Sequence, residues 1–262
     1  MLNYSQNEMD FFRTCLFDYD LRLDGRSKIQ LRDFSILNDV IKSCMSSYKL
    51  SYMDNQKEIL FTVKGEIVPK QSAKEERLLN VTIDSMYKIE DNKLKKEIEN
   101  YIEILILDKI DPEILRINKN FDDFYWRLNV DVYIFDALRM SLLQLLFIGV
   151  KNVIKNIKLP NLVLFTNEIT GEKEFDLVEL YEDVSEHDKE YPIEMDLSVP
   201  DVYVFAILNN SIMLDPTEEE FSIANSIVII SKLGNSVTNV QSIGSSVDIQ
   251  KLAEISSLIK SI

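Results

Sequence analysis

The sequence predicts an α+β fold of mixed sheets with hairpins, two long helices and a C-terminal helix. Three observations support this class. Short alternating stretches are joined mostly by hairpin turns rather than βαβ crossovers, helical periodicity covers residues 93–110 and 137–157, and a long alternating strand over residues 125–135 lies between them. No stretch resembles a linker rich in Pro, Gly or Ser. We therefore expect an N-terminal helix over residues 1–21, followed by a single compact domain over residues 22–262.

The first third of the chain predicts one helix and several strands. Met9, Phe12, Leu16 and Tyr19 recur at helical spacing, which predicts a helix over residues 5–21. The Asp24-Gly25 pair supplies a turn. Alternation then predicts strands over residues 34–36, 48–52, 59–67 and 78–83, with a hairpin turn at Asp54-Asn55 before the third.

The middle of the chain alternates helix, strand and helix. Residues 93–110 carry an apolar stripe, and Asp111-Pro112 ends that helix. The strand over residues 125–135 alternates apolar and polar side chains, so one face should be buried. The helix over residues 137–157 is apolar almost all round in its first half, interrupted by Gln144, so it should lie between two layers.

The last third predicts hairpins and a terminal helix. After a short strand over residues 162–165, hairpins are expected around Asn209-Asn210 and around Gly234-Asn235. Residues 247–262 form the final helix, with Ser246 as its cap. Asp215 should cap a short helical turn with Pro216 in its first position, an interpretation we prefer to a carboxylate site for Mg²⁺.

Composition excludes several function classes. Cys15 and Cys44 form no paired motif, so a zinc ribbon is excluded and a disulfide framework is not expected. A single histidine, His187, excludes multi-histidine sites, and its acidic surroundings favour a surface position. The six glycines are too scattered for a phosphate-binding loop. No signal peptide or apolar run of about 20 residues occurs, so the sequence indicates an intracellular, soluble protein without a membrane partner.

The net charge of −15, from 29 basic and 44 acidic residues, argues against sequence-independent duplex binding. Residues 168–196 hold 12 acidic residues and two lysines, so this segment carries −10 of the total. Two interpretations stay open: a solvated excursion, or a face that repels RNA or docks a basic partner. In either case we expect the segment to lie off any RNA path.

Three stretches, taken together, resemble RNase PH-type domains. The first is Leu21-Arg22-Leu23-Asp24-Gly25-Arg26 followed by Arg32-Asp33-Phe34. The second is Asn129-Val130-Asp131-Val132 leading to Asp136-Ala137, a long helix and Pro160. The third runs from Val199-Pro200 through Leu214-Asp215-Pro216-Thr217 and Glu220 to Ala224-Asn225. The stretch from Leu208 to Pro216, with Ala224-Asn225, is most similar to one particular subunit of exosome rings.

The resemblance implies an RNase PH fold and a place in the six-membered ring of a eukaryotic RNA exosome. Its partners would be five other RNase PH-like ring subunits, RNA-binding cap subunits, a hydrolytic exoribonuclease, and single-stranded RNA passing through the assembled ring. The complex would process and degrade RNA 3′→5′ in nucleus, nucleolus and cytoplasm. No cofactor or metal is expected.

The same resemblance implies that catalysis has been lost. Active members carry a Gly-Thr-Arg element at the start of the central helix, whereas here residues 133–139 contain none and Arg139 is out of step. They also carry arginines where residues 84–92 hold only Lys88, and a second aspartate where Phe221 stands, six residues after Asp215. We therefore expect no catalytic residues. The alternatives are an active phosphorolytic exoribonuclease and an unrelated α+β interaction domain.

Four lysines are the candidate RNA-binding residues: Lys88, Lys93, Lys95 and Lys96. The resemblance places the loop before the first long helix toward the channel, where lysines would act as point charges on passing phosphates. The alternative is that these lysines form surface pairs with Glu97 and Glu99. Arg22 and Arg26 are expected to anchor the Asp24-Gly25 turn by salt bridges, and Arg127 to form a surface ion pair.

Overall fold

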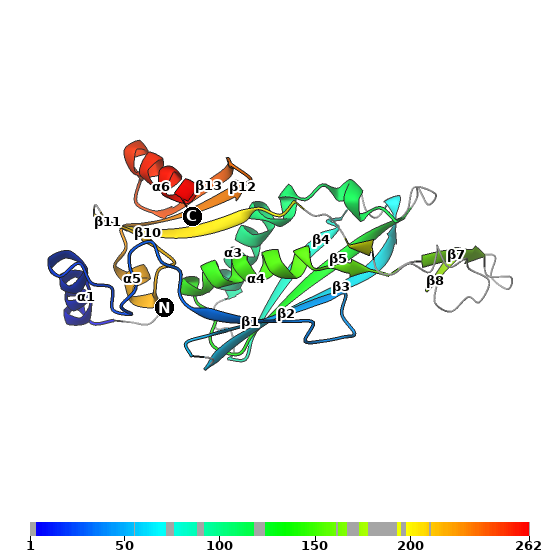
Figure 1. Cartoon of the computed structure of the whole chain (residues 1–262), viewed down its shortest axis with the longest axis horizontal. Coiled ribbons are helices and arrows are strands. Elements are labelled where there is room, and N and C mark those ends of the chain that lie inside the picture. The colour runs from blue at the N-terminus through cyan, green and yellow to red at the C-terminus, as the bar shows by residue number, and fades with distance from the viewer. Residues whose placement is uncertain are drawn as a thin grey trace.

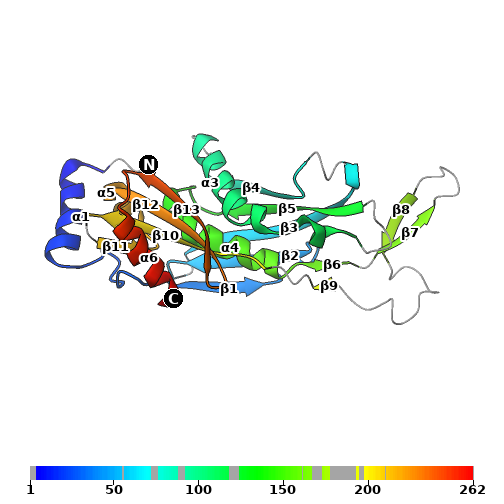
Figure 2. The ribbon, with the colours of Figure 1, turned by 90° about the horizontal axis from the view of Figure 1, so that it is seen from above.

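The structure is a computed structural model in which two β-sheets enclose a central helix (Figure 1). It describes residues 4–54, 56–71, 76–87, 92–117, 124–160, 162–166, 173–177, 193–194, 198–209 and 211–261. Of residues 163–166, 173–177, 193–194 and 261, only the backbone is described. Helix α1 lies at one end of the molecule and the β7–β8 hairpin at the other (Figures 1 and 2).

The first sheet has five strands in the order β1-β2-β3-β5-β4. Their bounds are β1 (Phe34–Asn38), β2 (Ser46–Tyr52), β3 (Lys57–Pro69), β4 (Leu79–Ser85) and β5 (Phe124–Ile134). Neighbouring strands are antiparallel except β4 and β5, which are parallel because α3 carries the chain back between them. The alternating burial of β5 confirms the predicted single buried face.

The second sheet has four strands in the order β11-β10-β12-β13. It consists of two predicted hairpins: β10 (Asp201–Leu208) with β11 (Ser211–Leu214), and β12 (Ser226–Leu233) with β13 (Ser236–Gly244). The positive φ angles of Asn209 and Gly234 confirm both turns. Helix α6 (Ile249–Ser261) packs Ile255 and Ile259 on one face of this sheet.

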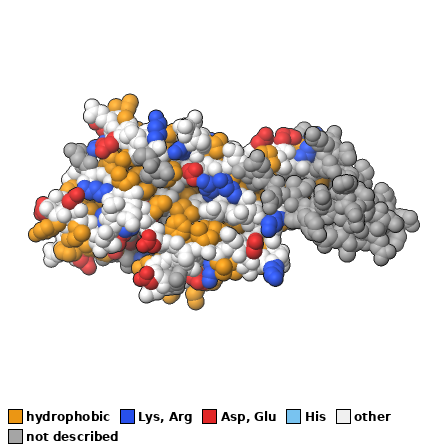
Figure 3. Space-filling model, in the orientation of Figure 1, with side chains coloured by type: hydrophobic (Ala, Val, Ile, Leu, Met, Phe, Trp, Pro, Cys, Tyr) orange, Lys and Arg blue, Asp and Glu red, His pale blue; other side chains and the backbone are white. Residues whose placement is uncertain are grey.

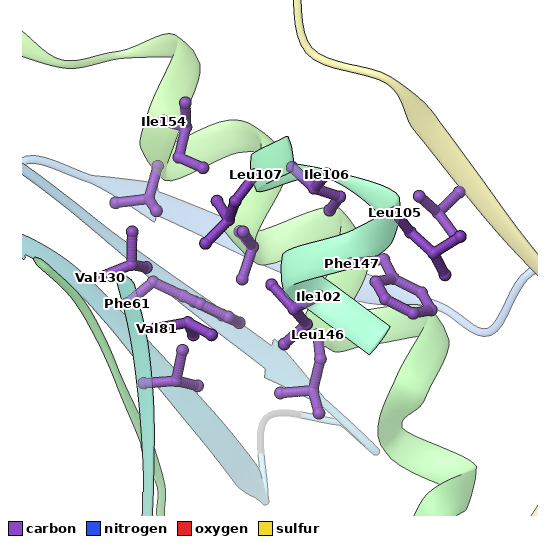
Figure 4. Packing of buried hydrophobic residues seen from close by; sticks show 14 of the residues in the cluster. Phe61, Val81, Ile102, Leu105, Ile106, Leu107, Val130, Leu146, Phe147 and Ile154 are labelled. Atoms are coloured by element: carbon purple, nitrogen blue, oxygen red, sulfur yellow. The ribbon is translucent and has the colours of Figure 1, made fainter. Parts of the chain in front are cut away.

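Helix α4 (Leu143–Lys155) lies between the two sheets, as its apolar circumference predicts. Its residues Leu146, Phe147 and Ile154 belong to the same main core as Phe61 and Val130 of the first sheet (Figure 4). The expected start at residue 137 is wrong. Arg139 is extended and a 3₁₀ turn, η3 (Met140–Leu142), precedes the α-helix, because the chain must still leave β5 and reach the interior.

The one polar residue in the first half of α4 has a structural role. Gln144 is buried, donates from Nε2 to the Val202 carbonyl (3.0 Å) and accepts from the Val204 amide (2.8 Å). This part of β10 extends beyond its pairing with β11, so the Gln144 side chain satisfies backbone groups there.

Helix α3 (Asn92–Leu105) is shorter than predicted. It ends at Leu105, and the chain continues as two 3₁₀ turns, η1 (Leu107–Lys109) and η2 (Pro112–Leu115). Ile106, Leu107 and Ile110 are all buried. An α-helix with one apolar face could not bury the neighbouring residues Ile106 and Leu107 on different sides, so the chain leaves the α-helical path here.

Helix α1 (Gln6–Asp18) has a capping box in which Ser5 and Glu8 exchange hydrogen bonds. Its buried residues Phe12 and Leu16 join the main core, and α1 packs against α5 (Glu218–Ile223). The boundary between an N-terminal helix over residues 1–21 and a domain over residues 22–262 stays a prediction.

The predicted cap of α6 is wrong. Asp248, not Ser246, accepts a hydrogen bond from the amide of Gln250 (3.2 Å). The remaining described strands form two small pairs, β6 (Lys158–Leu159) with β9 (Ile193–Glu194) and β7 (Leu162–Thr166) with β8 (Lys173–Leu177). Most of the acidic segment over residues 168–196, including His187, lies outside the described residues. None of the described helices combines the length and apolarity that a membrane span requires.

Gly149 generates a stability prediction. A methyl group at Gly149 would overlap the ring of Phe61, which is fully buried in β3. Gly149→Ala should therefore destabilise the protein by about 3 kcal/mol through overpacking, although alanine favours an isolated helix by about 0.5–1 kcal/mol. Urea unfolding measures the change. Adding Phe61→Leu should recover part of it, and a stabilising Gly149→Ala would contradict the packing described.

Candidate functional site at the start of the central helix

Arg22 is the centre of a buried ion-pair network. Its side chain is 1% exposed, and its Nε and Nη2 each donate to a carboxylate oxygen of Glu220 at 2.7 Å. Nη1 donates to the Leu214 carbonyl (3.1 Å) and Nη2 to the Asp215 carbonyl (3.0 Å). The bidentate geometry and the carbonyl acceptors satisfy a charge that would otherwise be costly to bury.

Two further arginines converge on Asp215, which is fully buried. Arg26 donates from Nη1 to Oδ2 (3.0 Å), and Arg32 donates from Nη2 to Oδ1 (2.6 Å) and from its backbone amide to Oδ2 (2.8 Å). Burial acts against the charge of Arg32, but the adjacent Asp215 carboxylate outweighs it and raises the pKa of the guanidinium. Asp215 thus accepts from both side chains and one backbone amide.

We call Arg22, Arg26, Arg32, Asp215 and Glu220 the arginine–carboxylate cluster. Asp24 completes it through Arg26 Nε (2.6 Å). Burial raises the pKa of Asp24, but the hydrogen bond and charge of Arg26 outweigh this and hold the pKa below its usual value. Counting Asp24, three guanidinium groups face three carboxylates, so the charges balance and each arginine already has an acidic partner.

The cluster corrects one prediction and confirms another. Asp215 does not cap the following helix. Thr217 is the N-cap of α5 and forms a capping box with Glu220, so Pro216 precedes the cap. The prediction that Arg22 and Arg26 anchor the Asp24-Gly25 turn by salt bridges is confirmed, since both contact Asp24 (3.9 and 2.6 Å). Each also has a second carboxylate partner about 190 positions away in the chain. Sequence reasoning missed Glu220 as a partner, although the Thr217-to-Glu220 spacing is that of a capping box.

The cluster contacts the start of the central helix. Arg32 Nη2 donates to the Ser141 carbonyl (2.8 Å), and the Ser141 hydroxyl donates to Glu218 (2.7 Å). These bonds fix η3 against α5. The sequence resemblance implies that active RNase PH-type domains carry their Gly-Thr-Arg element at this helix start.

The strand end before η3 has a different character from a phosphate-binding loop. Phe135 is 49% exposed, and Asp136 forms an ion pair with Lys57. Burial raises the pKa of Asp136, but the hydrogen bond from Lys57 outweighs it and lowers the pKa below the usual value. Arg139 is half-buried nearby. Burial raises the pKa of Tyr52 to about 12, with the charge of Asp136 adding to the rise and those of Arg32 and Arg139 opposing it.

The four candidate lysines do not share one environment. Lys93 and Lys96 are exposed near the start of α3. Lys95 is half-buried and contacts Asp84 (3.6 Å) and Glu99 (3.7 Å), so the helix-surface interpretation is confirmed for this residue. Lys88 lies outside the described residues.

Arg127 forms the predicted surface ion pairs, with Glu66 (3.3 Å) and Glu76 (2.5 Å). Among the described residues there is no group of three or more His, Cys, Asp or Glu side chains arranged to hold a metal ion. The prediction that no metal or cofactor is required stays a prediction.

Comparisons with known proteins agree with the sequence resemblance. No protein-family model matches the chain. Over 221 residues it is 24% identical to the exosome complex component RRP42 of Saccharomyces cerevisiae, covering 84% of this chain and 77% of that protein. RRP42, ribosomal RNA-processing protein 42, is also the ring subunit that the stretch from Leu208 to Pro216 most resembles, so this recognition is confirmed.

Solved structures show the fold. The chain aligns with an archaeal exosome core (TM-score 0.67, 18% identity, 96% of this chain and 91% of that chain). It also aligns with the Archaeoglobus fulgidus exosome with RNA bound to the active site (TM-score 0.70, 17% identity, 96% and 93%). A third match is rice (Oryza sativa) Rrp46 (TM-score 0.59, 14% identity, 92% and 93%). The predicted α+β, RNase PH-type fold is therefore confirmed.

The cluster generates a prediction about stability. Arg22→Ala leaves the buried Glu220 carboxylate without its bidentate partner, so it should cost about 3–5 kcal/mol. Replacing both residues, as Arg22→Met with Glu220→Gln, should recover part of the stability because no uncompensated charge remains buried. Chemical unfolding measures both. A cost of Arg22→Ala below about 1 kcal/mol, as for an exposed pair, would contradict the buried geometry.

Proposed function

We propose that this chain is a non-catalytic, structural subunit of a six-membered RNase PH-type ring of an RNA exosome, where it helps to form the channel for 3′→5′ RNA processing and degradation. One observation carries the proposal. Each of the three arginines gathered beside the start of the central helix already has a carboxylate partner: Arg22 binds Glu220, Arg26 binds Asp24 and Asp215, and Arg32 binds Asp215.

Phosphorolysis requires the opposite arrangement. Inorganic phosphate must be held beside the 3′-terminal linkage by cations that are available in the transition state. In the arginine–carboxylate cluster, carboxylates of the protein already bind the arginines, so a phosphate ion would have to displace them. The cluster therefore supports a role in joining the two halves of the subunit rather than in catalysis.

The similarity to RRP42 and to exosome cores supports the proposed partners. These are five other RNase PH-like subunits, RNA-binding cap subunits, a hydrolytic exoribonuclease and single-stranded RNA passing through the assembled ring. Such a complex would act in nucleus, nucleolus and cytoplasm. The acidic segment over residues 168–196 would lie off the RNA path, since carboxylates lining a channel repel phosphates.

An assay for phosphorolysis tests the non-catalytic role. The purified chain, alone and assembled with its ring partners, should release no nucleoside diphosphate from a single-stranded oligoribonucleotide when inorganic phosphate is added. Arg139→Ala and Ser141→Ala change the start of the central helix outside the cluster and serve as controls. Phosphate-dependent shortening that either variant abolishes would establish the active exoribonuclease instead.

The lysines of α3 generate a second prediction. We propose that Lys93 and Lys96, with Lys88, guide RNA as point charges. In the assembled ring, Lys93→Ala with Lys96→Ala should flatten the dependence of log K on log salt by about 0.7 for each phosphate that is no longer neutralised. Lys95→Ala is the matched control, since Lys95 is half-buried beside Asp84 and Glu99 whereas Lys93 and Lys96 are exposed. Equal slopes for all variants would leave these lysines with a helix-surface role only.

A further inference from the structure

Strand β1 has an open outer edge. It is the first strand of the five-stranded sheet, and no described strand pairs with its outer side. Other edges are covered: the Ile83 amide of β4 donates to Glu99 Oε1 (2.9 Å), and the Leu214 amide of β11 donates to the Lys28 carbonyl (2.8 Å). A bulge at Thr238 interrupts β13, the edge of the second sheet, where the Thr238 hydroxyl donates to Ser231. An open edge offers unpaired backbone groups to an added strand.

Both faces of β1 carry exposed apolar side chains. Ile36 lies opposite Leu50, which is fully buried, yet Ile36 itself is 48% exposed. Leu37 points to the other face of the sheet and is 55% exposed. Helix α4 packs on β2 and β3, so the edge strand β1 extends beyond the part of the sheet that the helix covers. Figure 3 shows apolar side chains gathered near the middle of the face that carries β1 in Figure 1.

The charges at the ends of β1 restrict which partner fits. Asp33 and Asp39 are both exposed, and the five residues of β1 between them, Phe34–Asn38, are uncharged. Asp39 also has an ion pair with Lys158 (3.8 Å), but both side chains are exposed, and such a pair contributes little. If two copies of this chain paired antiparallel about Ile36, Asp33 of each copy would face Asp39 of the other. Parallel pairing would bring each aspartate beside its own equivalent. Like charges directly opposite each other destabilise strand pairing, so a second copy is disfavoured.

We propose that β1 docks an extended apolar segment, with basic residues at both ends, from a neighbouring RNase PH-type subunit. This inference rests on the proposed ring function and names the surface used. The segment adds a strand to the five-stranded sheet, and its backbone pairs with the open edge. Its apolar side chains cover Ile36 and Leu37, which are exposed on the two faces of β1, and its basic ends face Asp33 and Asp39.

Hydrogen exchange on the assembled complex tests this docking. The chain is co-expressed with the RNase PH-type chains of its own genome, purified, and compared with the free chain. The Asp39 amide donates to the Ser47 carbonyl of β2 (2.8 Å), so the antiparallel register turns the amides of Phe34, Ile36 and Asn38 outward. These three amides should exchange at least tenfold more slowly in the complex. The Ile83 amide, already bonded to Glu99, reports any general stabilisation and should not slow to the same extent.

A charge-neutralising pair tests the specificity. Asp33→Asn with Asp39→Asn should weaken binding to the co-purified neighbour at least fivefold. Asparagine tolerates the positive φ of residue 39, so the fold is kept. Asp108→Asn with Glu254→Gln removes the same amount of charge from exposed positions on η1 and α6 and should leave binding unchanged. Equal binding by both pairs would overturn the assignment of basic ends.

The outcomes separate this inference from the proposed function. If a ring assembles but β1 amides exchange as in the free chain, the docking surface is wrong and the ring function stands. If no RNase PH-type chain co-purifies, both are wrong. If the chain alone forms a dimer that protects β1, a second copy occupies the edge and the assignment to a different subunit is overturned.

Discussion

The buried contact between Arg22 and Glu220 holds together parts of the chain that are 198 positions apart. One side of the contact is the loop after α1, and the other is the capping box of α5. Glu220 has two structural roles, because it also accepts from the Thr217 amide at the start of that helix (2.9 Å). Arg26, Arg32 and Asp215 extend the contact to η3, where the central helix begins. The loop after α1, α5 and η3 therefore depend on one set of charges.

This network explains why three separated motifs occur in one chain. The Arg22-to-Arg26 stretch, Arg32 and the Asp215-to-Glu220 stretch are weak signals individually, yet in the structure they are donors and acceptors of a single cluster. Burying Arg22 and half-burying Arg26 and Arg32 is tolerable only because carboxylates and backbone carbonyls surround them. The same neutralisation removes the cations that phosphate would need, so the interactions that stabilise the fold also support the proposed loss of catalysis.

The surfaces suggest how an acidic chain would fit into the proposed ring. The net charge is −15, and residues 168–196 carry most of it, whereas the start of α3 exposes Lys93 and Lys96. Strand β1 contributes an uncharged edge between two aspartates, with apolar side chains on both faces. Electrostatics on such a subunit would act through local patches at the start of α3 and at β1, since exposed charges are screened beyond about 10 Å at ordinary ionic strength.

Periodicity and turn chemistry in the sequence determined the fold class, most strands, both hairpin turns and the position of α4 between layers, because these are local or depend on which face is apolar. Tertiary structure decided the helix ends and the site. Helix α3 ends at Leu105 because packing on several sides takes over, and Asp215 serves as an ion-pair acceptor rather than a cap because arginines distant in the chain reach it. The partners of a buried charge depend on which segments the fold brings together, and no local pattern around Asp215 or Glu220 contains that information.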